Sequence, residues 1–288
     1  MKDLRLLNRV LIILTTVFLI MILTPAAFAG QAEARWFTPY YEGNSVTMPD
    51  DAAIETSFDF AGTVTDQYKG ILVKVSKGND SVHYYYPAVD NAVQGDVYLR
   101  FGKGAYRVDF NLVKPNNGNP GVIKYDSLAR VQVENTGDAD MRYLLPSWGI
   151  ESDASAIVQK AQQISGQADD DYKRVKNIFD WVSKNMVYDM DKFRRGEFYD
   201  NEGAVKALQT KKGLCRDYAN LVTALVRAEG IEARTVIGQA GTDGNWYGHA
   251  WNEVKIGGRW ISMDAVWKVF DQDNSIFGKT HIKAQEVY

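Results

Sequence analysis

The chain is poor in cysteine and histidine. It has one cysteine, Cys215, and three histidines among 288 residues. A single cysteine cannot form a disulfide within the chain, so a fold held together by internal disulfides is excluded. Cys215, in the segment KKGLCRDYANL (211–221), is therefore a buried small hydrophobe, an intermolecular linker or a reactive thiol. The compartment and the downstream residues decide between these alternatives.

The chain also lacks a strong net charge, internal repeats and low-complexity tracts. Its formal net charge is −3, with 45% hydrophobic and 24% charged residues. This composition is sufficient for an ordinary core, and a mildly acidic chain has no electrostatic footprint for nucleic acid or for an anionic membrane surface. We therefore expect no nucleic-acid partner.

Only one long apolar run is present, VLIILTTVFLIMIL at 10–23, and it follows a basic start. The run is short for a transmembrane helix, which needs about 20 residues. The small-x-small sequence AFA at 27–29 is typical of a signal-peptidase site. We predict a signal peptide over 1–29 and an exported protein, secreted or associated with the cell envelope, that contacts the membrane only transiently through this segment. An uncleaved N-terminal anchor is the alternative.

Residues 44–145 alternate between apolar and polar positions, which is typical of strands with one buried face. In YRVDFNLV (106–113), Tyr106, Val108, Phe110 and Leu112 fall on one face. Six to eight short strands separated by polar turns predict an all-β, sandwich-like domain over 30–145. The one histidine of this half, His83, is interpreted as a side chain on a strand face.

The second half begins with helical periodicity and ends with strands, which predicts an α+β domain over 152–288. Ser152 or Asp153 is expected to cap the first helix, and Gly230 to end the last one. The first helix is expected to start near 152, and three further helices are expected over 170–189, 202–210 and 216–229. The expected strands cover 233–240, 249–256 and 259–267.

Cys215 lies at the predicted start of a helix. A helix N-terminus carries partial positive charge and free backbone N–H groups, which favour a thiolate over a thiol. The same N–H groups could stabilise the oxyanion that forms when an acyl group is attacked. The position therefore suits a nucleophile.

A base and an orienting acid are available on two paired strands. Gly257-Gly258 makes a good two-residue hairpin loop, so we expect Ile256 to pair with Arg259. In that register Asp264 lies opposite Trp251, and His249 lies diagonally from Asp264 on the same face, within side-chain reach. Such an acid can fix the tautomer of a histidine that serves a cysteine.

The blocks GLCRDYANL, GHAWNEV and W-x-x-x-D (Trp260 to Asp264) resemble the transglutaminase-like superfamily of cysteine enzymes in type, order and spacing. The resemblance covers roughly 152–270. It implies Cys215 as nucleophile, His249 as base and Asp264 as orienting acid, in a papain-like transglutaminase core of helices and antiparallel sheet. Tyr188 and Trp251 are the candidates for an oxyanion-assisting or cleft position.

No metal or cofactor is expected. DQDNSIFG (271–278) has acidic residues at alternating positions, but a calcium loop needs Gly and Glu where Ile276 and Ile282 stand.

The implied reaction is thiolate attack on a carboxamide or peptide carbonyl of a protein or cell-wall peptide, giving a thioester. An amine acceptor would make the protein a transferase, and water would make it a cysteine peptidase or amidase. A non-catalytic adaptor that keeps the fold is the third alternative.

Overall fold

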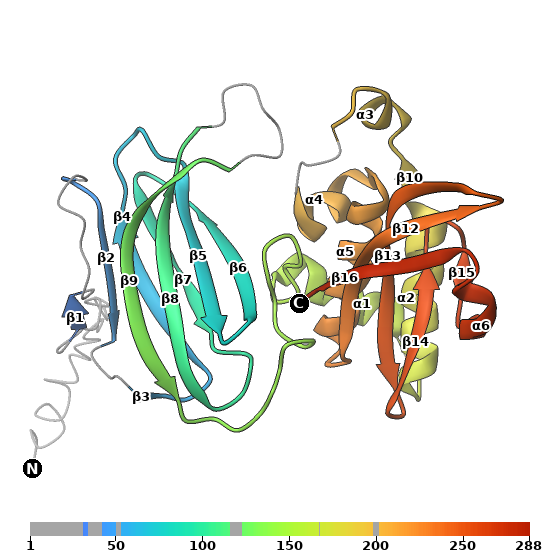
Figure 1. The fold of residues 1–288 in the computed structure, drawn as a ribbon, viewed down its shortest axis with the longest axis horizontal. Coiled ribbons are helices and arrows are strands. Elements are labelled where there is room, and N and C mark those ends of the chain that lie inside the picture. The colour runs from blue at the N-terminus through green and yellow to red at the C-terminus, as the bar shows by residue number, and fades with distance from the viewer. Residues whose placement is uncertain (1–30, 34–41, 50–52, 116–122, 167, 198–201) are drawn as a thin grey trace, which may run out of the picture.

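The computed structural model describes residues 31–33, 42–49, 53–115, 123–166, 168–197 and 202–288. They form a β-sandwich and an α+β part that lie side by side (Figure 1). The predicted signal segment, 1–29, lies outside the described residues. Within the described ranges no helix has the length and hydropathy needed to span a bilayer.

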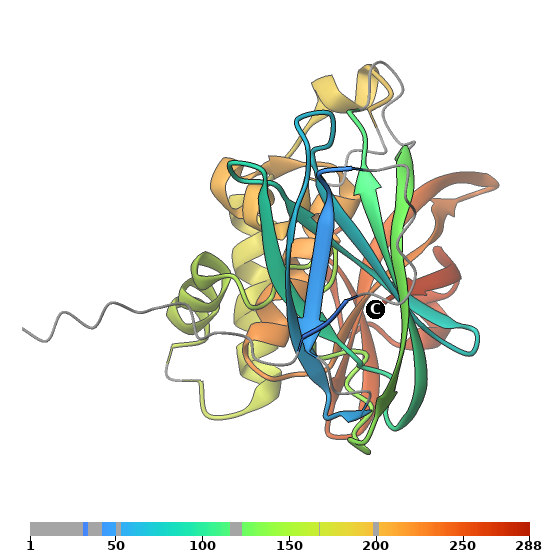
Figure 2. The ribbon, with the colours of Figure 1, turned by 90° about the vertical axis from the view of Figure 1, so that its left-hand side faces the viewer.

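The sandwich consists of two sheets with strand orders β1-β2-β4-β7 and β3-β9-β8-β5-β6. Viewed from the sandwich side, its strands lie in front of the α+β part (Figure 2). One hydrophobic core fills the sandwich. The strands are β1 (Gln31–Glu33), β2 (Ser45–Pro49), β3 (Ala53–Ile54), β4 (Ser57–Thr63), β5 (Gly70–Lys77), β6 (Asp80–Pro87), β7 (Ala92–Tyr98), β8 (Gly104–Val113) and β9 (Tyr125–Asn135).

Strand β8 shows why this half folds as a sandwich. Its four alternating apolar side chains, from Tyr106 to Leu112, are at most 2% exposed, as the period-two pattern predicts. Burying side chains of this size contributes about 1.5–3 kcal/mol each. The predicted all-β sandwich is confirmed.

The α+β part packs helices α1, α2, α4 and α5 on one face of a five-stranded sheet with the order β15-β14-β13-β12-β16, and the short helix α6 packs on the other face (Figure 1). Helix α5 is buried along almost its whole length at the centre of the second core. The elements are α1 (Ser155–Ser165), α2 (Asp171–Asn185), β10 (Val187–Tyr188), α3 (Met190–Arg194), α4 (Gly203–Thr210), β11 (Lys212–Gly213), α5 (Cys215–Ala228), β12 (Ala233–Thr242), β13 (Asn245–Ile256), β14 (Arg259–Asp264), β15 (Val269–Phe270), α6 (Asn274–Phe277) and β16 (His281–Val287).

The predicted α+β class is confirmed, with two corrections in detail. Helix α1 starts later than expected, and its N-cap residue is Ala154, which makes no side-chain capping bond, so the predicted cap at Ser152 or Asp153 is wrong. The short elements α3, α6 and β16 were not predicted from the sequence. Gly230 does end α5, with φ at 74°, a conformation that glycine adopts without strain.

A segment around 140–154 and the last residue join the two parts. Arg100 is fully buried and donates from Nε to the Tyr84 hydroxyl at 3.0 Å and from its guanidinium to the Pro146 carbonyl. On the other side, the Tyr288 hydroxyl donates to Asp80 at 3.1 Å. These bonds tie the α+β part to the sandwich.

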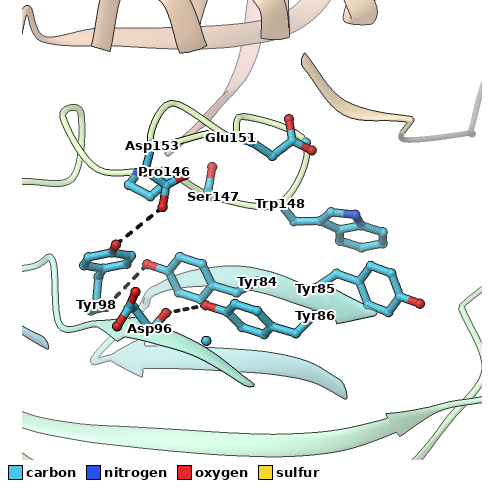
Figure 3. Close-up of a pocket in the computed structure, with 12 residues that line it drawn as sticks. Tyr84, Tyr85, Tyr86, Asp96, Tyr98, Pro146, Ser147, Trp148, Glu151 and Asp153 are labelled. Carbon is cyan, nitrogen blue, oxygen red and sulfur yellow. Dashed lines mark hydrogen bonds between the residues drawn. The ribbon is translucent and has the colours of Figure 1, made fainter. Parts of the chain in front are cut away.

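A cavity lies at this junction (Figure 3). The Tyr98 hydroxyl points across it toward Asp153, with 3.5 Å between the two oxygens. None of the three predicted catalytic residues lines the cavity, so it is separate from the candidate active site. Its walls are formed by Tyr84, Tyr85, Tyr86, Gly95, Asp96, Tyr98, Pro146, Ser147, Trp148, Gly149, Glu151 and Asp153.

Candidate active site

Cys215 is the first residue of α5 and is partly exposed. The turn before it is fixed by Asp217, whose carboxylate accepts the backbone N–H of Leu214 at 2.7 Å. Asp217 is buried, which raises the pKa of its carboxyl group, and Lys192 lies 3.8 Å from it. This bond fixes the start of α5, where the first backbone N–H groups have no acceptor within the helix.

Gly213 allows the close approach that this turn requires. A Cβ added at Gly213 would lie 2.5 Å from the Asp217 Cβ and 2.6 Å from its Oδ2. Any side chain at position 213 would therefore push away the carboxylate that holds the start of α5.

The hairpin β13–β14 has the register expected from its turn. Gly257 and Gly258 have φ values of 57° and 79°, as a two-residue hairpin loop of this type needs. Ile256 lies opposite Arg259, and the ladder continues in the same register to Asn252 opposite Met263. The predicted register is confirmed, and it brings His249 and Asp264 together on one face.

His249 Nε2 lies 2.7 Å from Asp264 Oδ2. Asp264 is fully buried, and its other oxygen, Oδ1, accepts the backbone N–H groups of Val266 at 2.8 Å and Trp267 at 3.1 Å. Burial alone would raise the pKa of Asp264, but hydrogen bonds from His249 and from a second histidine outweigh it and lower the pKa to about 2. The carboxylate is therefore ionised at neutral pH.

His249 is linked to both of its predicted partners. Burial disfavours the charged ring, but side-chain hydrogen bonds to Asp264 and to Cys215 raise the pKa of His249 to about 9. Because Nε2 faces Asp264, Nδ1 is the ring nitrogen left for the thiol. The structure thus brings Cys215, His249 and Asp264 together in an arrangement that suits an imidazolium–thiolate pair.

Tyr188 lies beside the thiol, on the other side of the helix start. Strand β10 runs parallel to β11, with Tyr188 opposite Gly213. The Tyr188 hydroxyl accepts the backbone N–H of Cys215, and burial followed by the nearby Cys215 raises its pKa to about 12. Tyr188 is therefore a neutral hydroxyl that pairs with the backbone N–H group of Cys215.

Trp251, the other candidate for an oxyanion or cleft position, is buried beside the base. It is 2% exposed and packs with Phe277 and Val236, and its ring centroid is 6.4 Å from that of His249. Its indole N–H has no hydrogen-bond partner among the described residues. The tight packing around Trp251 makes it a support behind the base.

His281 is a residue of this site that the sequence did not reveal. It starts β16, which no clear periodicity predicts, and its Nε2 lies 3.2 Å from Asp264 Oδ2. Its other nitrogen, Nδ1, lies 2.9 Å from the Thr280 hydroxyl. The remaining histidine, His83, lies in the sandwich strand β6.

The ring nitrogens of His249 and His281 and a carboxylate oxygen of Asp264 lie within 4.8 Å of one another, close enough to be considered as metal ligands. The hydrogen bonds between these side chains use the same atoms that would bind a metal, because Asp264 Oδ2 faces the Nε2 atoms of both histidines. A carboxylate only accepts, so both Nε2 atoms carry hydrogen in this arrangement. Metal binding would require both rings to lose those hydrogens.

Comparison with known proteins finds a family match within the α+β part. The sequence profile of the transglutaminase-like superfamily matches residues 158–265. Residues 158–265 form a transglutaminase-like domain. The matched range contains Cys215, His249 and Asp264 but ends before His281.

Relatives of the transglutaminase-like domain include kyphoscoliosis peptidase from Mus musculus, which is 28% identical over 124 residues. The human protein of the same name is 28% identical over 123 residues. In both cases the match covers 39% of this chain and 18% of the relative. The chain thus spans about a fifth of the length of these curated relatives.

Similar solved structures include a candidate cysteine protease from Cytophaga hutchinsonii, at a TM-score of 0.43 and 19% identity, covering 81% of this chain and 82% of that chain. The periplasmic domain of TgpA from Pseudomonas aeruginosa is similar at a TM-score of 0.35 and 14% identity, covering 83% of this chain and 89% of that chain.

Proposed function

We propose that this protein is an exported, cysteine-dependent acyl-transfer enzyme that attacks carboxamide or peptide bonds in protein or cell-wall peptide substrates. The observation that carries the proposal is the position of His249, which is hydrogen-bonded to Asp264 on one side and to Cys215 on the other. The thiol stands at the N-terminus of a buried helix, where a thiolate is favoured.

In the proposed reaction the Cys215 thiolate attacks the carbonyl carbon, and the carbonyl oxygen takes the negative charge. We expect the N–H groups at the start of α5 to donate to that oxygen, with the Tyr188 hydroxyl as a further donor once it turns from the Cys215 N–H that it accepts in this structure. The His249 imidazolium then gives its Nδ1 proton to the departing amine as the C–N bond breaks, which leaves a thioester and a neutral imidazole. Asp264 holds the ring in this tautomer throughout.

The thioester ends the first half of the reaction, and an acceptor completes the second. An amine or a water molecule attacks the thioester carbonyl, His249 takes the proton of the acceptor, and the thiolate leaves. An amine gives a new amide, which is transglutaminase chemistry, and water gives a carboxylate. The name of the kyphoscoliosis peptidase relatives favours water as a second candidate acceptor.

Both products can be measured in one experiment. Purified mature protein is incubated with a glutamine-rich protein and a fluorescent primary amine, and both amine incorporation and release of ammonia or peptides are followed. We expect one of these activities and its loss in Cys215→Ser. If neither product forms with the wild-type protein under conditions where Cys215 is accessible, the adaptor alternative is supported over an enzyme.

Export is a separate part of the proposal. The mature chain is expected to start near residue 30, after the predicted signal segment. Intact-mass measurement of protein recovered from the envelope or medium tests this. A mass that includes the apolar run 10–23 would instead support an N-terminal anchor.

A further inference from the structure

His281 is a buried, titratable side chain whose ring points at the carboxylate of the candidate active site. Its side chain is 1% exposed, and it comes from β16, outside the matched family range. Strand β16 lies against β12, where His281 is opposite Ala240. The fold therefore brings a second imidazole to Asp264, from a strand that begins 17 residues further along the chain.

The ring of His281 is held on every side that the structure describes. It stacks on Phe277 with ring centroids 3.9 Å apart and planes 11° apart. The rings of Trp251 and Trp267 lie 5.1 Å and 5.0 Å away. Thr280 Oγ1 contacts Nδ1 at 2.9 Å and also lies 3.1 Å from the Phe277 carbonyl. This packing leaves Nε2 aimed at Asp264.

The hydrogen bond from His281 completes the partners of Asp264. A carboxylate offers about four lone-pair positions. At Asp264, Oδ1 accepts two backbone N–H groups, and Oδ2 lies 2.7 Å from His249 and 3.2 Å from His281. A fully buried carboxylate with an unfilled position would be less stable as an anion and less fixed in orientation.

We propose that His281 is a positioning residue for the cysteine chemistry: its Nε2–H holds Asp264 Oδ2 in the charged, oriented state in which that oxygen fixes His249. This inference rests on the proposed function of the Cys215–His249 pair. The Nε2–H bond to Asp264 can form whether the His281 ring is neutral or charged. In the neutral ring Nδ1 accepts from the Thr280 hydroxyl, and in the charged ring Nδ1–H donates to it.

The test compares two substitutions of His281. His281→Phe keeps an aromatic ring against Phe277 but removes the donor, and His281→Gln can place an amide N–H near the position of Nε2. The measurement is the rate of Cys215 alkylation by iodoacetamide between about pH 4 and pH 8. Thr280→Val, which removes the contact on Nδ1 and leaves Nε2 unchanged, is the matched control.

We expect His281→Phe to slow alkylation about tenfold at mildly acidic pH, because one hydrogen bond to a charged group is lost. The acid limb of its pH profile should also move to higher pH, since the Asp264 anion is less stabilised. His281→Gln should restore most of the rate and the wild-type acid limb, and Thr280→Val should change little. Equal pH profiles for the Phe and Gln variants would overturn the proposal. They would mean that the N–H donor, which only the Gln variant has, makes no difference to the reactivity of the thiol.

Three further measurements keep the inference separate from the proposed function. If wild-type Cys215 shows no His249-dependent reactivity, the proposed function fails first. If both His281 variants unfold, ¹⁵N NMR of the wild-type histidines decides, because a His281 Nε2 without hydrogen would overturn the proposal. Chelator-treated protein should keep full reactivity, and a loss that zinc ions restore would show that the three groups hold a metal.

Discussion

Replacing Asp264 with asparagine is expected to destabilise the protein in a pH-dependent manner. An amide nitrogen at the position of Oδ2 would face two N–H donors, so the hydrogen bond to Asp264, which together with the one to Cys215 raises the pKa of His249 from 6.5 to about 9, would be lost. One pKa unit corresponds to about 1.4 kcal/mol, so the whole shift is worth about 3 kcal/mol, and the loss of the Asp264 part should cost about 1–3 kcal/mol. The same bond also lowers the pKa of Asp264, together with the bond from His281, so the two shifts are not added.

The sign of each shift sets the pH window. The folded-state pKa of His249 is raised, so its contribution is complete below about pH 6.5 and is lost as pH rises through about 9. The folded-state pKa of Asp264 is lowered to about 2, so its contribution is complete above about pH 4 and is lost as pH falls through 2. The loss in Asp264→Asn should therefore be largest between about pH 4 and pH 6.5.

Urea unfolding followed by tryptophan fluorescence measures this difference at about pH 5.5 and again above pH 9. Asp271→Asn is the matched control, because Asp271 pairs at 3.0 Å with Arg259, which is largely exposed, and should give a much smaller change. A loss in Asp264→Asn that is small at pH 5.5, or that does not decline above pH 9, would refute the reasoning.

Three other substitutions test the support of the site. Gly238→Ala should lower the free energy of unfolding by about 1–3 kcal/mol, because the added Cβ would lie 2.1 Å from a backbone carbonyl oxygen of β16. Gly248→Ala is the control, because the space around its added Cβ is open and no such loss is expected. Urea unfolding of the two variants measures the difference. Gly213→Ala should displace Asp217 and slow alkylation of the thiol without unfolding the protein, as measured by mass spectrometry. Tyr188→Phe should leave alkylation unchanged but lower kcat about 10–100-fold, measured with any substrate found, if its hydroxyl donates to the oxyanion.

Local chemistry made much of the site predictable. The hairpin register followed from two glycines, because a two-residue loop fixes which residues pair. Since side chains alternate along a strand, that register also placed His249 and Asp264 on one face. The start of α5 followed from the apolar periodicity after Cys215.

The parts that were missed depend on contacts between distant segments. His281 reaches Asp264 only because β16 packs on the far side of β12, and the sequence HIKAQEV has no strong alternation to indicate that strand. Trp251 shares a strand face with His249, but whether that face opens to solvent depends on α6, which covers it with Phe277. Periodicity does not report such tertiary coverage.

In the proposed mechanism His249 keeps Cys215 as an accessible thiolate. This pairing can be tested by the pH dependence of iodoacetamide alkylation of the mature protein, measured beside His249→Ala. We expect wild-type Cys215 to react well below about pH 8, where an ordinary thiol is mostly protonated, and the variant to lose this reactivity. A thiol that stays inert until the protein is unfolded, or one that reacts equally in His249→Ala, would contradict it.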